Sequence, residues 1–348
     1  MRGAYNPPFP FPLLQVFPMR FLIAVLVSLF SLSALAQTVP PPALAAKAWA
    51  LVDHATGQTL AEKDADARIE PASLTKLMTA YITFSKLKEG SLKPDQVVPV
   101  STKAWRMEGS RMFIEPNKPV SVDELIRGVI VQSGNDACVA LAETIAGSEE
   151  AFAALMNREA QRLGMTNTHF TNSTGLPDPQ LYTSARDLAV LASAIVRDFP
   201  EYYGLYSLKE FTYNGIKQPN RNRLLYMDPS VDGMKTGHTS SAGYCLVSTA
   251  RRGERRLVSV VLGAASDSVR AQESLKLLNF GYQFYETVKL YSADEALSKF
   301  RVWKGKLNEL PVGFTKDFAL TVPKEAANKI QVSLESRQPL VAPLQRGQ

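Results

Sequence analysis

The chain has 348 residues, of which 45% are hydrophobic and 21% are charged, and this is ordinary globular composition with enough length for one large domain and one small one. The net charge of +6 suits an anionic surface such as a membrane or a cell-wall polymer. Basic residues are not interleaved with aromatic ones, so we expect no nucleic-acid partner. One short basic cluster, Arg251, Arg252, Arg255 and Arg256, surrounds a turn glycine and is expected to be a solvated hairpin tip.

The two cysteines, Cys138 and Cys245, are too few for a disulfide framework, so stability has to come from the core. Each lies in an apolar stretch, where a free thiol packs as a small hydrophobic group. We expect both to be buried free thiols, and the sequence leaves a single bridge between them open.

The N-terminus is predicted to hold an export signal. Met19 is followed by an arginine, an apolar run over residues 21–30 and an Ala-x-Ala site that ends at Ala36. A charged start, an apolar core too short to cross a membrane and a small-residue cleavage site are typical of a secretory signal. We therefore expect residues 1–36 to be a signal peptide, with an uncleaved anchor helix as the alternative. Residues 1–18 are rich in proline and do not fit this plan, so we expect the true start at Met19.

The mature chain is expected to begin with a proline-rich linker, residues 37–44, and to continue into a large domain, residues 45–287. Strands near both ends of this domain, with helices between them, predict an α+β fold. Residues 109–120 hold Gly, Asn and two Pro and are expected to form a long loop. The expected elements are strands 45–52 and 59–63, helices 74–87, 122–131, 135–145, 149–163 and 185–198, a hairpin of strands 244–250 and 256–262, and a last long helix, 269–286.

The pattern changes after residue 287. Short alternating runs at 300–303, 318–322 and 330–334 are separated by Pro and Gly. We expect residues 288–348 to form a small β-rich second domain.

Ser73-Leu-Thr-Lys76 lies at the start of a predicted helix. Residues three apart share a helix face, so the Lys76 amine can reach the Ser73 hydroxyl. A serine is a poor nucleophile without a base, and a lysine is a base only if burial or another cation lowers its pKa. The motif is weak evidence by itself, because a non-catalytic N-cap serine followed by a surface lysine would give the same sequence pattern.

Two further short motifs carry polar groups. Ser133-Gly-Asn135 lies between two predicted helices, where the hydroxyl could pass a proton and the amide could hold a substrate amide; its ordinary alternative is a turn and cap. Lys235-Thr-Gly237 is expected to open the strand that leads to Tyr244. It offers a positive charge, a hydroxyl for a carboxylate, and a glycine that lets a ligand approach the strand backbone.

In this order, the three motifs are the signature of penicillin-binding proteins and the related β-lactamases. From about Ala45 onward the chain resembles the low-molecular-mass D-alanyl-D-alanine carboxypeptidases. The resemblance implies a penicillin-binding/β-lactamase-like transpeptidase domain, an antiparallel sheet with a helical cluster, followed by the small β-rich domain. The stretches that carry it are PASLTKLMT at 71–79, QSGNDAC at 132–138, NSTGLPD at 172–178, SARDLA at 184–189 and VDGMKTGHT at 231–239.

The resemblance also implies the chemistry. Ser73 is then the nucleophile, Lys76 its base and Ser133 the group that passes the proton to the leaving group, while Asn135 binds the substrate amide. The reaction is removal of the terminal D-Ala from a peptidoglycan stem peptide through an acyl-enzyme, and β-lactam antibiotics acylate the same serine as covalent inhibitors.

The carboxylate side of the substrate is implied to meet Lys235 and Thr236, with Gly237 beside them. The backbone N–H groups of Ser73 and His238 are the implied oxyanion hole, and the His238 ring is expected to be a local packing group.

Arg221 and Arg270 are candidates for shaping the carboxylate side, with surface ion pairing as the alternative. His54 and His169 are expected to be structural, and no catalytic metal and no cofactor are expected. The loop at 109–120 resembles a family loop behind the site that influences deacylation.

The sequence departs from class A β-lactamases at Gly134, where those enzymes have Asp, and no counterpart of their deacylating glutamate is evident. We therefore expect slow β-lactam hydrolysis. The alternatives that stay open are a D,D-endopeptidase, a β-lactamase and a non-catalytic peptidoglycan-binding protein.

Full-length relatives, by the same resemblance, continue into an amphipathic helix that associates peripherally with the inner membrane. No such helix is evident before Gln348, so we expect the small domain to be incomplete and the protein to be free in the periplasm.

Overall fold

The computed structural model describes residues 39–334 and 339–344. The expected signal peptide at residues 1–36 and the expected start at Met19 lie outside these residues. Among the described residues, no helix is both long and apolar enough to cross a membrane.

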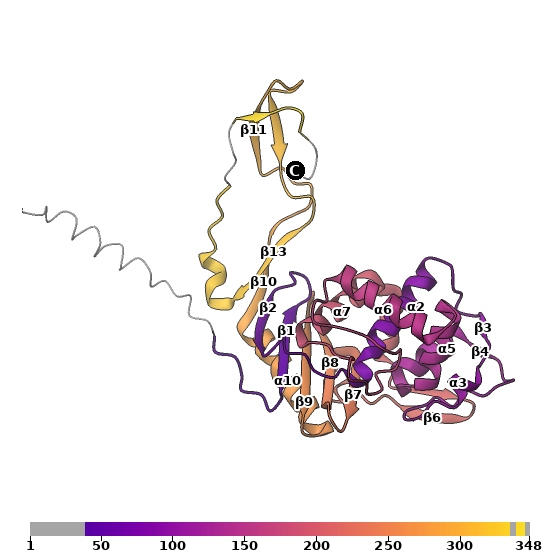
Figure 1. Cartoon of the computed structure of the whole chain (residues 1–348). Helices are drawn as coiled ribbons and strands as arrows, with labels where there is room; N and C mark the ends of the chain where they lie inside the picture. The colour runs from indigo at the N-terminus through magenta and orange to yellow at the C-terminus, as the bar shows by residue number, and fades with distance from the viewer. Residues whose placement is uncertain (1–38, 335–338, 345–348) are drawn as a thin grey trace, which may run out of the picture. The chain divides into compact units, whose positions relative to one another are not determined.

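A five-stranded antiparallel sheet, in the order β2-β1-β9-β8-β7, forms the centre of the large domain (Figure 1). The chain makes this sheet from two distant segments, because β1 pairs with β9 and Ala50 lies opposite Val260. The predicted hairpin is confirmed, with Arg252 opposite Arg255 at its turn. The strands are β1 (Ala48–Asp53), β2 (Thr59–Lys63), β7 (Val231–Thr239), β8 (Gly243–Arg252) and β9 (Arg255–Ala264).

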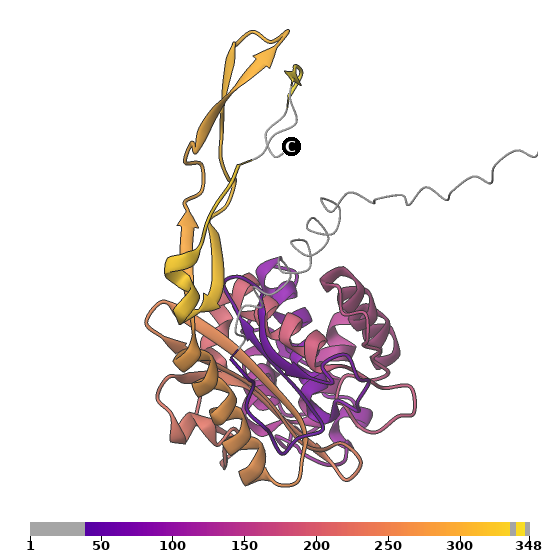
Figure 2. The same cartoon turned by 90° about the vertical axis from the view of Figure 1, so that its left-hand side faces the viewer.

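Both faces of this sheet are covered by helices (Figure 2). Ala50 and Val260 belong to the main hydrophobic core, together with the helices that lie between β2 and β7 in sequence. Leu51 and Leu257 point the other way, since a Cβ placed on Gly281 of helix α10 (Asp267–Phe284) would meet both side chains. Strands covered on both faces read as almost continuous apolar runs, which is why β1 and β9 carry few polar residues.

The helices between β2 and β7 form the helical cluster that the sequence predicts. Several are longer than three turns, and the short ones connect them. They are η1 (Ala72–Thr75), α2 (Lys76–Lys88), α3 (Thr102–Trp105), α4 (Val122–Arg127), η2 (Gly128–Gln132), α5 (Asn135–Ala146), α6 (Glu149–Leu163), α7 (Ala185–Asp198), α8 (Pro200–Tyr203), η3 (Gly204–Ser207) and α9 (Leu224–Met227). Two short ribbons lie among them, β3 (Val97–Val98) with β4 (Val120–Ser121) and β5 (Glu210–Tyr213) with β6 (Ile216–Pro219).

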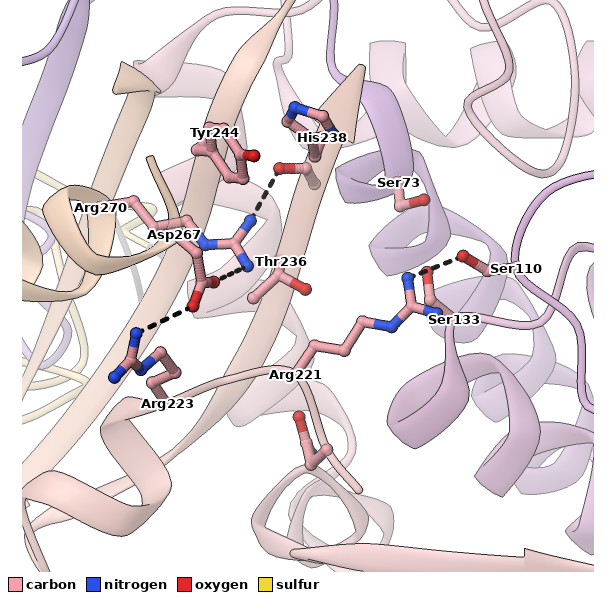
Figure 3. Close-up of a pocket in the computed structure, with 12 residues that line it drawn as sticks. Ser73, Ser110, Ser133, Arg221, Arg223, Thr236, His238, Tyr244, Asp267 and Arg270 are labelled. Carbon is pink, nitrogen blue, oxygen red and sulfur yellow. Dashed lines mark hydrogen bonds and ion pairs between the residues drawn. The ribbon is translucent and has the colours of Figure 1, made fainter. Parts of the chain in front are cut away.

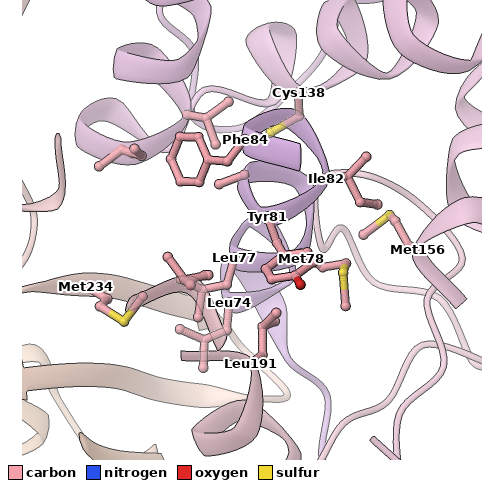
Figure 4. Close-up of a cluster of buried hydrophobic side chains, with 14 of the residues drawn as sticks. Leu74, Leu77, Met78, Tyr81, Ile82, Phe84, Cys138, Met156, Leu191 and Met234 are labelled. Atoms are coloured by element: carbon pink, nitrogen blue, oxygen red, sulfur yellow. The ribbon is translucent and has the colours of Figure 1, made fainter. Parts of the chain in front are cut away.

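Helix α2 runs through the middle of the hydrophobic core (Figure 4). All but three of its 13 residues are buried, including Leu77, Met78, Ile82 and Phe84. A helix that is apolar all round is stable only when other elements surround it. Its first residue, Lys76, is therefore held in a place that water hardly reaches.

Some predicted boundaries are corrected by the structure. The expected helix from residue 74 begins instead as the 3₁₀ turn η1, and α-helical geometry starts at Lys76. The expected last helix ends at Phe284, because Tyr285 starts strand β10. Lys235-Thr-Gly237 lies inside β7 and does not open the strand that holds Tyr244; a turn reverses the chain and places Tyr244 opposite His238 on β8.

The small C-terminal part is β-rich, as predicted. The expected runs at 300–303 and 318–322 are strands, but 330–334 is not, and Val332 and Leu334 are each 53% exposed. Its strands are β10 (Tyr285–Tyr291) paired with β13 (Phe318–Pro323), and β11 (Ser298–Trp303) between β12 (Glu309–Val312) and β14 (Leu340–Val341), with a 3₁₀ segment, η4 (Lys324–Lys329), after β13.

The expectation for the two cysteines is confirmed, because Cys138 and Cys245 are both buried and free. The expectation for the arginine cluster is only half right. Arg251 is exposed at the hairpin turn, but the side chain of Arg255 is only 14% exposed and donates to the fully buried Asp53 at 2.9 Å. Arg256 is held in the same way by two 2.6 Å contacts with Asp232. Carboxylates on the distant strands β1 and β7 hold these two arginines, which the local sequence could not indicate.

This difference within the cluster predicts unequal effects on stability. Arg255→Met keeps the aliphatic stem but leaves the buried Asp53 carboxylate without its cation, so the free energy of unfolding should fall by about 3 kcal/mol. The matched control is Arg251→Met, which removes an exposed pair with Glu254 and should cost less than about 1 kcal/mol. Urea unfolding of the two variants measures this, and equal losses would contradict it.

Candidate active site

The three motifs meet in one pocket of about 540 Å³ (Figure 3). It lies between the end of β7 and the helical cluster, and β8 and α10 also contribute to its lining. The residues that line it are Ser73, Ser110, Ser133, Asn220, Arg221, Arg223, Thr236, Gly237, His238, Tyr244, Asp267 and Arg270.

Ser73 and Lys76 are brought together by the 3₁₀ turn and the first residue of α2. The Lys76 Nζ donates to the Ser73 Oγ at 3.1 Å. It also donates to the Asn135 Oδ1 at 2.7 Å and to the Thr174 carbonyl at 2.6 Å. Lys76 is only 1% exposed, so the alternative of a surface lysine is wrong.

The surroundings of Lys76 make its neutral form easier to reach than that of an exposed lysine. Burial is the largest cause and lowers the pKa of the Lys76 amine to about 8. The positive charge of Arg221 lowers this pKa further, whereas Cys138 and Asp136 act in the opposite direction. Both conditions that the sequence argument set for a basic lysine, burial and a neighbouring cation, are therefore met.

Ser133 and Lys235 form a second pair on the other side of the pocket. The Lys235 Nζ donates to the Ser133 Oγ and to the Thr236 carbonyl, each at 3.0 Å. Ser133 has a left-handed backbone, with φ of 60°, at the turn between η2 and α5. That turn aims the hydroxyl at Lys235. Burial, with the charges of Lys76 and Arg221 in addition, lowers the pKa of Lys235 well below its usual value.

The side-chain amide of Asn135 is hydrogen-bonded to the first of these pairs through Lys76. Its Oδ1 accepts from Lys76, and its Nδ2 donates to the Glu108 carbonyl at 2.6 Å. A carbonyl oxygen has two lone pairs and an amide nitrogen has two hydrogens. Asn135 therefore keeps one acceptor and one donor for another partner.

Gly237 is required by packing within the protein. A Cβ at this position would lie 3.0 Å from the Pro71 carbonyl and 3.3 Å from the Leu74 backbone nitrogen. The neighbour that approaches the strand closely is thus the turn that carries Ser73, where we had expected a ligand. Because Gly237 lacks a side chain, β7 can lie directly against that turn.

Thr174 is a site residue that the sequence argument missed, although it lies in the NSTG stretch that carries the resemblance. Its carbonyl accepts from Lys76. The next residue, Gly175, has φ of +82°, and a Cβ there would lie 1.8 Å from the Ala72 carbonyl. Only glycine fits, so this loop is pressed against the nucleophile turn.

Arg270 and Arg221 both line the pocket, from different depths. Arg270 is 6% exposed, forms an ion pair with Asp267 and donates to the Gly237 carbonyl at 3.0 Å. Arg221 is exposed and donates to the Ser110 Oγ at 2.7 Å. Arg223, which the sequence argument did not single out, pairs with Asp267 at 3.3 Å.

The histidines lie outside the two Ser–Lys pairs. The His238 ring is exposed and packs against Tyr244, with ring centroids 4.0 Å apart. Burial lowers the pKa of His54, and the His169 ring is hydrogen-bonded to the Gln180 carbonyl. Across residues 39–334 and 339–344, no group of three or more His, Cys, Asp or Glu is placed to hold a metal ion.

Comparison with known proteins agrees with this geometry. The family described as D-alanyl-D-alanine carboxypeptidase matches residues 35–266, and the C-terminal domain of penicillin-binding protein 5 matches residues 285–348. The D-alanyl-D-alanine carboxypeptidase DacC of Escherichia coli is 46% identical over 320 residues, which cover 90% of this chain and 80% of that protein.

Solved structures agree as well. Penicillin-binding protein 5 from Haemophilus influenzae matches with a TM-score of 0.87 and 44% identity, over 89% of this chain and 92% of the other. Penicillin-binding protein D2 from Listeria monocytogenes, in its ampicillin-bound form, matches with a TM-score of 0.65 and 31% identity, over 70% of this chain and 100% of the other.

The fold and the grouped motifs define the class of penicillin-binding serine hydrolases, with the transpeptidase fold followed by a β-rich C-terminal domain. Within that class, the chain belongs to the D-alanyl-D-alanine carboxypeptidase family.

Proposed function

We propose that this chain removes the terminal D-Ala from peptidoglycan stem pentapeptides through an acyl-enzyme at Ser73. The observation that carries the proposal is the buried Lys76 amine, 3.1 Å from the Ser73 hydroxyl, with its pKa lowered to about 8. An amine in this state can take the hydroxyl proton near neutral pH, as nucleophilic catalysis by a serine requires.

The reaction starts with proton transfer from the Ser73 Oγ to Lys76, while the oxygen attacks the carbonyl carbon of the penultimate D-Ala. The carbonyl oxygen becomes an oxyanion, held by the backbone N–H groups of Ser73 and His238. Ser133, backed by Lys235, gives its proton to the departing amine and takes up the proton that Lys76 had accepted, so that Lys76 is neutral again when the C–N bond has broken and D-Ala leaves. Water then hydrolyses the Ser73 ester and restores the free hydroxyl.

The substrate is held on both sides of the bond that breaks. The free donor and acceptor of Asn135 suit the peptide group on the acyl side. The terminal carboxylate meets the hydroxyl of Thr236 and the positive charge of Lys235, with Arg221 and Arg270 lining the same pocket. Charge-assisted hydrogen bonds of this kind select a free C-terminus over an internal peptide bond.

β-Lactam antibiotics are proposed to acylate Ser73 by the same attack. In support, a relative with 31% identity has been solved in an ampicillin-bound form. No leaving group departs when a lactam ring opens, so the acyl-enzyme persists until water reaches it. We expect that last step to be slow.

Export to the periplasm is part of the proposal, because peptidoglycan stem peptides lie outside the inner membrane. The signal-like pattern of residues 19–36 supports it. N-terminal sequencing of the exported protein should find Gln37 as the first residue, and residues before Met19 would contradict the proposed start.

The test compares three substrates with the purified protein. D-Ala release from diacetyl-Lys-D-Ala-D-Ala should be faster than cleavage of cross-linked muropeptide and than hydrolysis of benzylpenicillin. Preference for cross-linked muropeptide would support the endopeptidase, and rapid loss of benzylpenicillin the β-lactamase. A folded protein that turns over none of the three and is not labelled by a fluorescent penicillin would favour a peptidoglycan-binding role.

A further inference from the structure

Glu70 connects two parts of the pocket wall that are far apart in the chain. It lies three residues before Ser73, and its carboxylate accepts from the Thr239 Oγ1 at 2.8 Å and from the Ser241 Oγ at 2.5 Å. Thr239 is the last residue of β7, and Ser241 lies in the turn between β7 and β8. One carboxylate therefore ties the segment of the nucleophile to the end of the strand that carries His238.

Both ends of this connection are held firmly. On one side, Ile69 exchanges two backbone hydrogen bonds with Thr183, at 2.8 and 2.9 Å, and Pro71 begins the 3₁₀ turn. On the other side, the Thr239 hydroxyl accepts from the Ala242 backbone N–H at 3.0 Å, which closes the turn. A carboxylate between two fixed segments sets their separation, whereas one on a loose loop would only follow it.

Gly237 supplies a second contact between the same two segments. Its Cα side lies against the Pro71 carbonyl and the Leu74 backbone nitrogen, close enough that no Cβ fits without movement. His238 follows Gly237 and precedes Thr239, so it lies between the packing contact and the Glu70 hydrogen bonds. The two contacts together fix the backbone N–H of His238 relative to that of Ser73.

We propose that Glu70 is a positioning residue for acyl transfer, because its carboxylate sets the spacing of the Ser73 and His238 N–H groups. This inference rests on the function proposed above, in which these two groups hold the oxyanion. The oxyanion forms fully only in the tetrahedral state, so a change in spacing weakens that state more than substrate binding. Removal of a whole donor in such a site costs about 100- to 1,000-fold, and displacement should cost less, roughly tenfold.

The experiment uses Glu70→Gln, which keeps the shape but removes the charge that both hydroxyls donate to. The kcat for D-Ala release and the rate of acylation by a fluorescent penicillin should each fall roughly tenfold, with KM within about twofold of wild type. Affinity for a peptide boronic acid, whose adduct with a serine is tetrahedral, should fall by a similar factor. The matched control is Glu62→Gln, an exposed glutamate paired with Arg186, which should change none of these values.

A second variant tests the connection from its other end and covers the case in which Glu70→Gln fails to fold. Thr239→Val with Ser241→Ala removes both donors and should reproduce the loss of kcat. Adding it to Glu70→Gln should give little further loss, because contacting residues couple and do not add. Losses that multiply, a rise of KM in parallel with the fall of kcat, or an unchanged boronate affinity would each overturn the inference. A wild-type protein inactive toward both peptide and penicillin would instead overturn the proposed function.

Discussion

Ser73→Ala is expected to abolish both D-Ala release and covalent labelling by a fluorescent penicillin. The change removes one oxygen, and the only described partner of that oxygen in a side-chain hydrogen bond is Lys76. The fold should therefore survive while the nucleophile is lost. Removal of a serine nucleophile leaves only the contribution of binding and oxyanion stabilisation, so kcat should fall by about 10⁴-fold or more. Mass spectrometry of the penicillin adduct and an assay of free D-Ala measure the two losses.

The matched control for this variant is Ser110→Ala, because Ser110 lines the same pocket and is hydrogen-bonded to Arg221. The rate of D-Ala release by Ser110→Ala can change, but the variant should still bind one penicillin covalently per chain. Labelling of the Ser73→Ala protein would show that another hydroxyl is the nucleophile. The pocket offers Ser133 as the obvious rival, and a Ser73→Ala/Ser133→Ala protein would then identify it.

Much of the fold could be predicted from the sequence, because the strongest sequence signals are those of local structure. Helices α6 and α7 begin and end at the predicted residues, and the β8–β9 hairpin follows from two apolar strands around a turn. The order of the three motifs was enough to expect a shared pocket. The local sequence does not show where one strand ends and the next begins. We therefore expected Lys235 to open the strand that holds Tyr244, whereas it lies inside β7 and Tyr244 lies on β8.

The features that could not be predicted, in the site and elsewhere, all depend on contacts across the fold. Thr174 contributes a backbone carbonyl, which every residue has, so its type gives no sign of its role. Arg223 and Asp267 meet only because α9 and α10 approach the same end of the pocket. The Arg255 side chain points inward because it forms an ion pair with the buried Asp53 carboxylate on β1. The run at 330–334 alternates as a strand would, yet it is not paired with another strand among the residues that the structure describes.

The two buried lysines beside the pocket, Lys76 and Lys235, are expected to have different roles although they carry the same charge. Both are buried, burial lowers the pKa of both, and the charge of Lys76 lowers the pKa of Lys235 further. Lys76 is held by two oxygen acceptors besides Ser73, whereas Lys235 lies beside Ser133 at the end of the pocket proposed for the carboxylate. An incoming anion would favour a proton on Lys235 and leave Lys76 as the neutral base.

Lys76→Met is expected to slow acylation of Ser73 by about 1,000-fold, within the range of general-base catalysis. Methionine keeps a long unbranched chain in the buried space but cannot accept a proton. The pH dependence carries the sharper test. Only neutral Lys76 is a base and its pKa is about 8, so wild-type acylation should rise about tenfold per pH unit below pH 8 and level off above it.

In Lys76→Met this rise should disappear, since the group that titrates is gone. Lys88→Met, at the exposed end of the same helix, is the control and should keep the wild-type profile. Rates of acylation by a fluorescent penicillin between pH 5 and about 10 measure all three profiles. If the rise persists in Lys76→Met, the titrating base is another group, and Lys235, whose pKa burial also lowers, becomes the candidate. The roles of the two lysines would then have to be exchanged, with Ser133 carrying the proton in the first step.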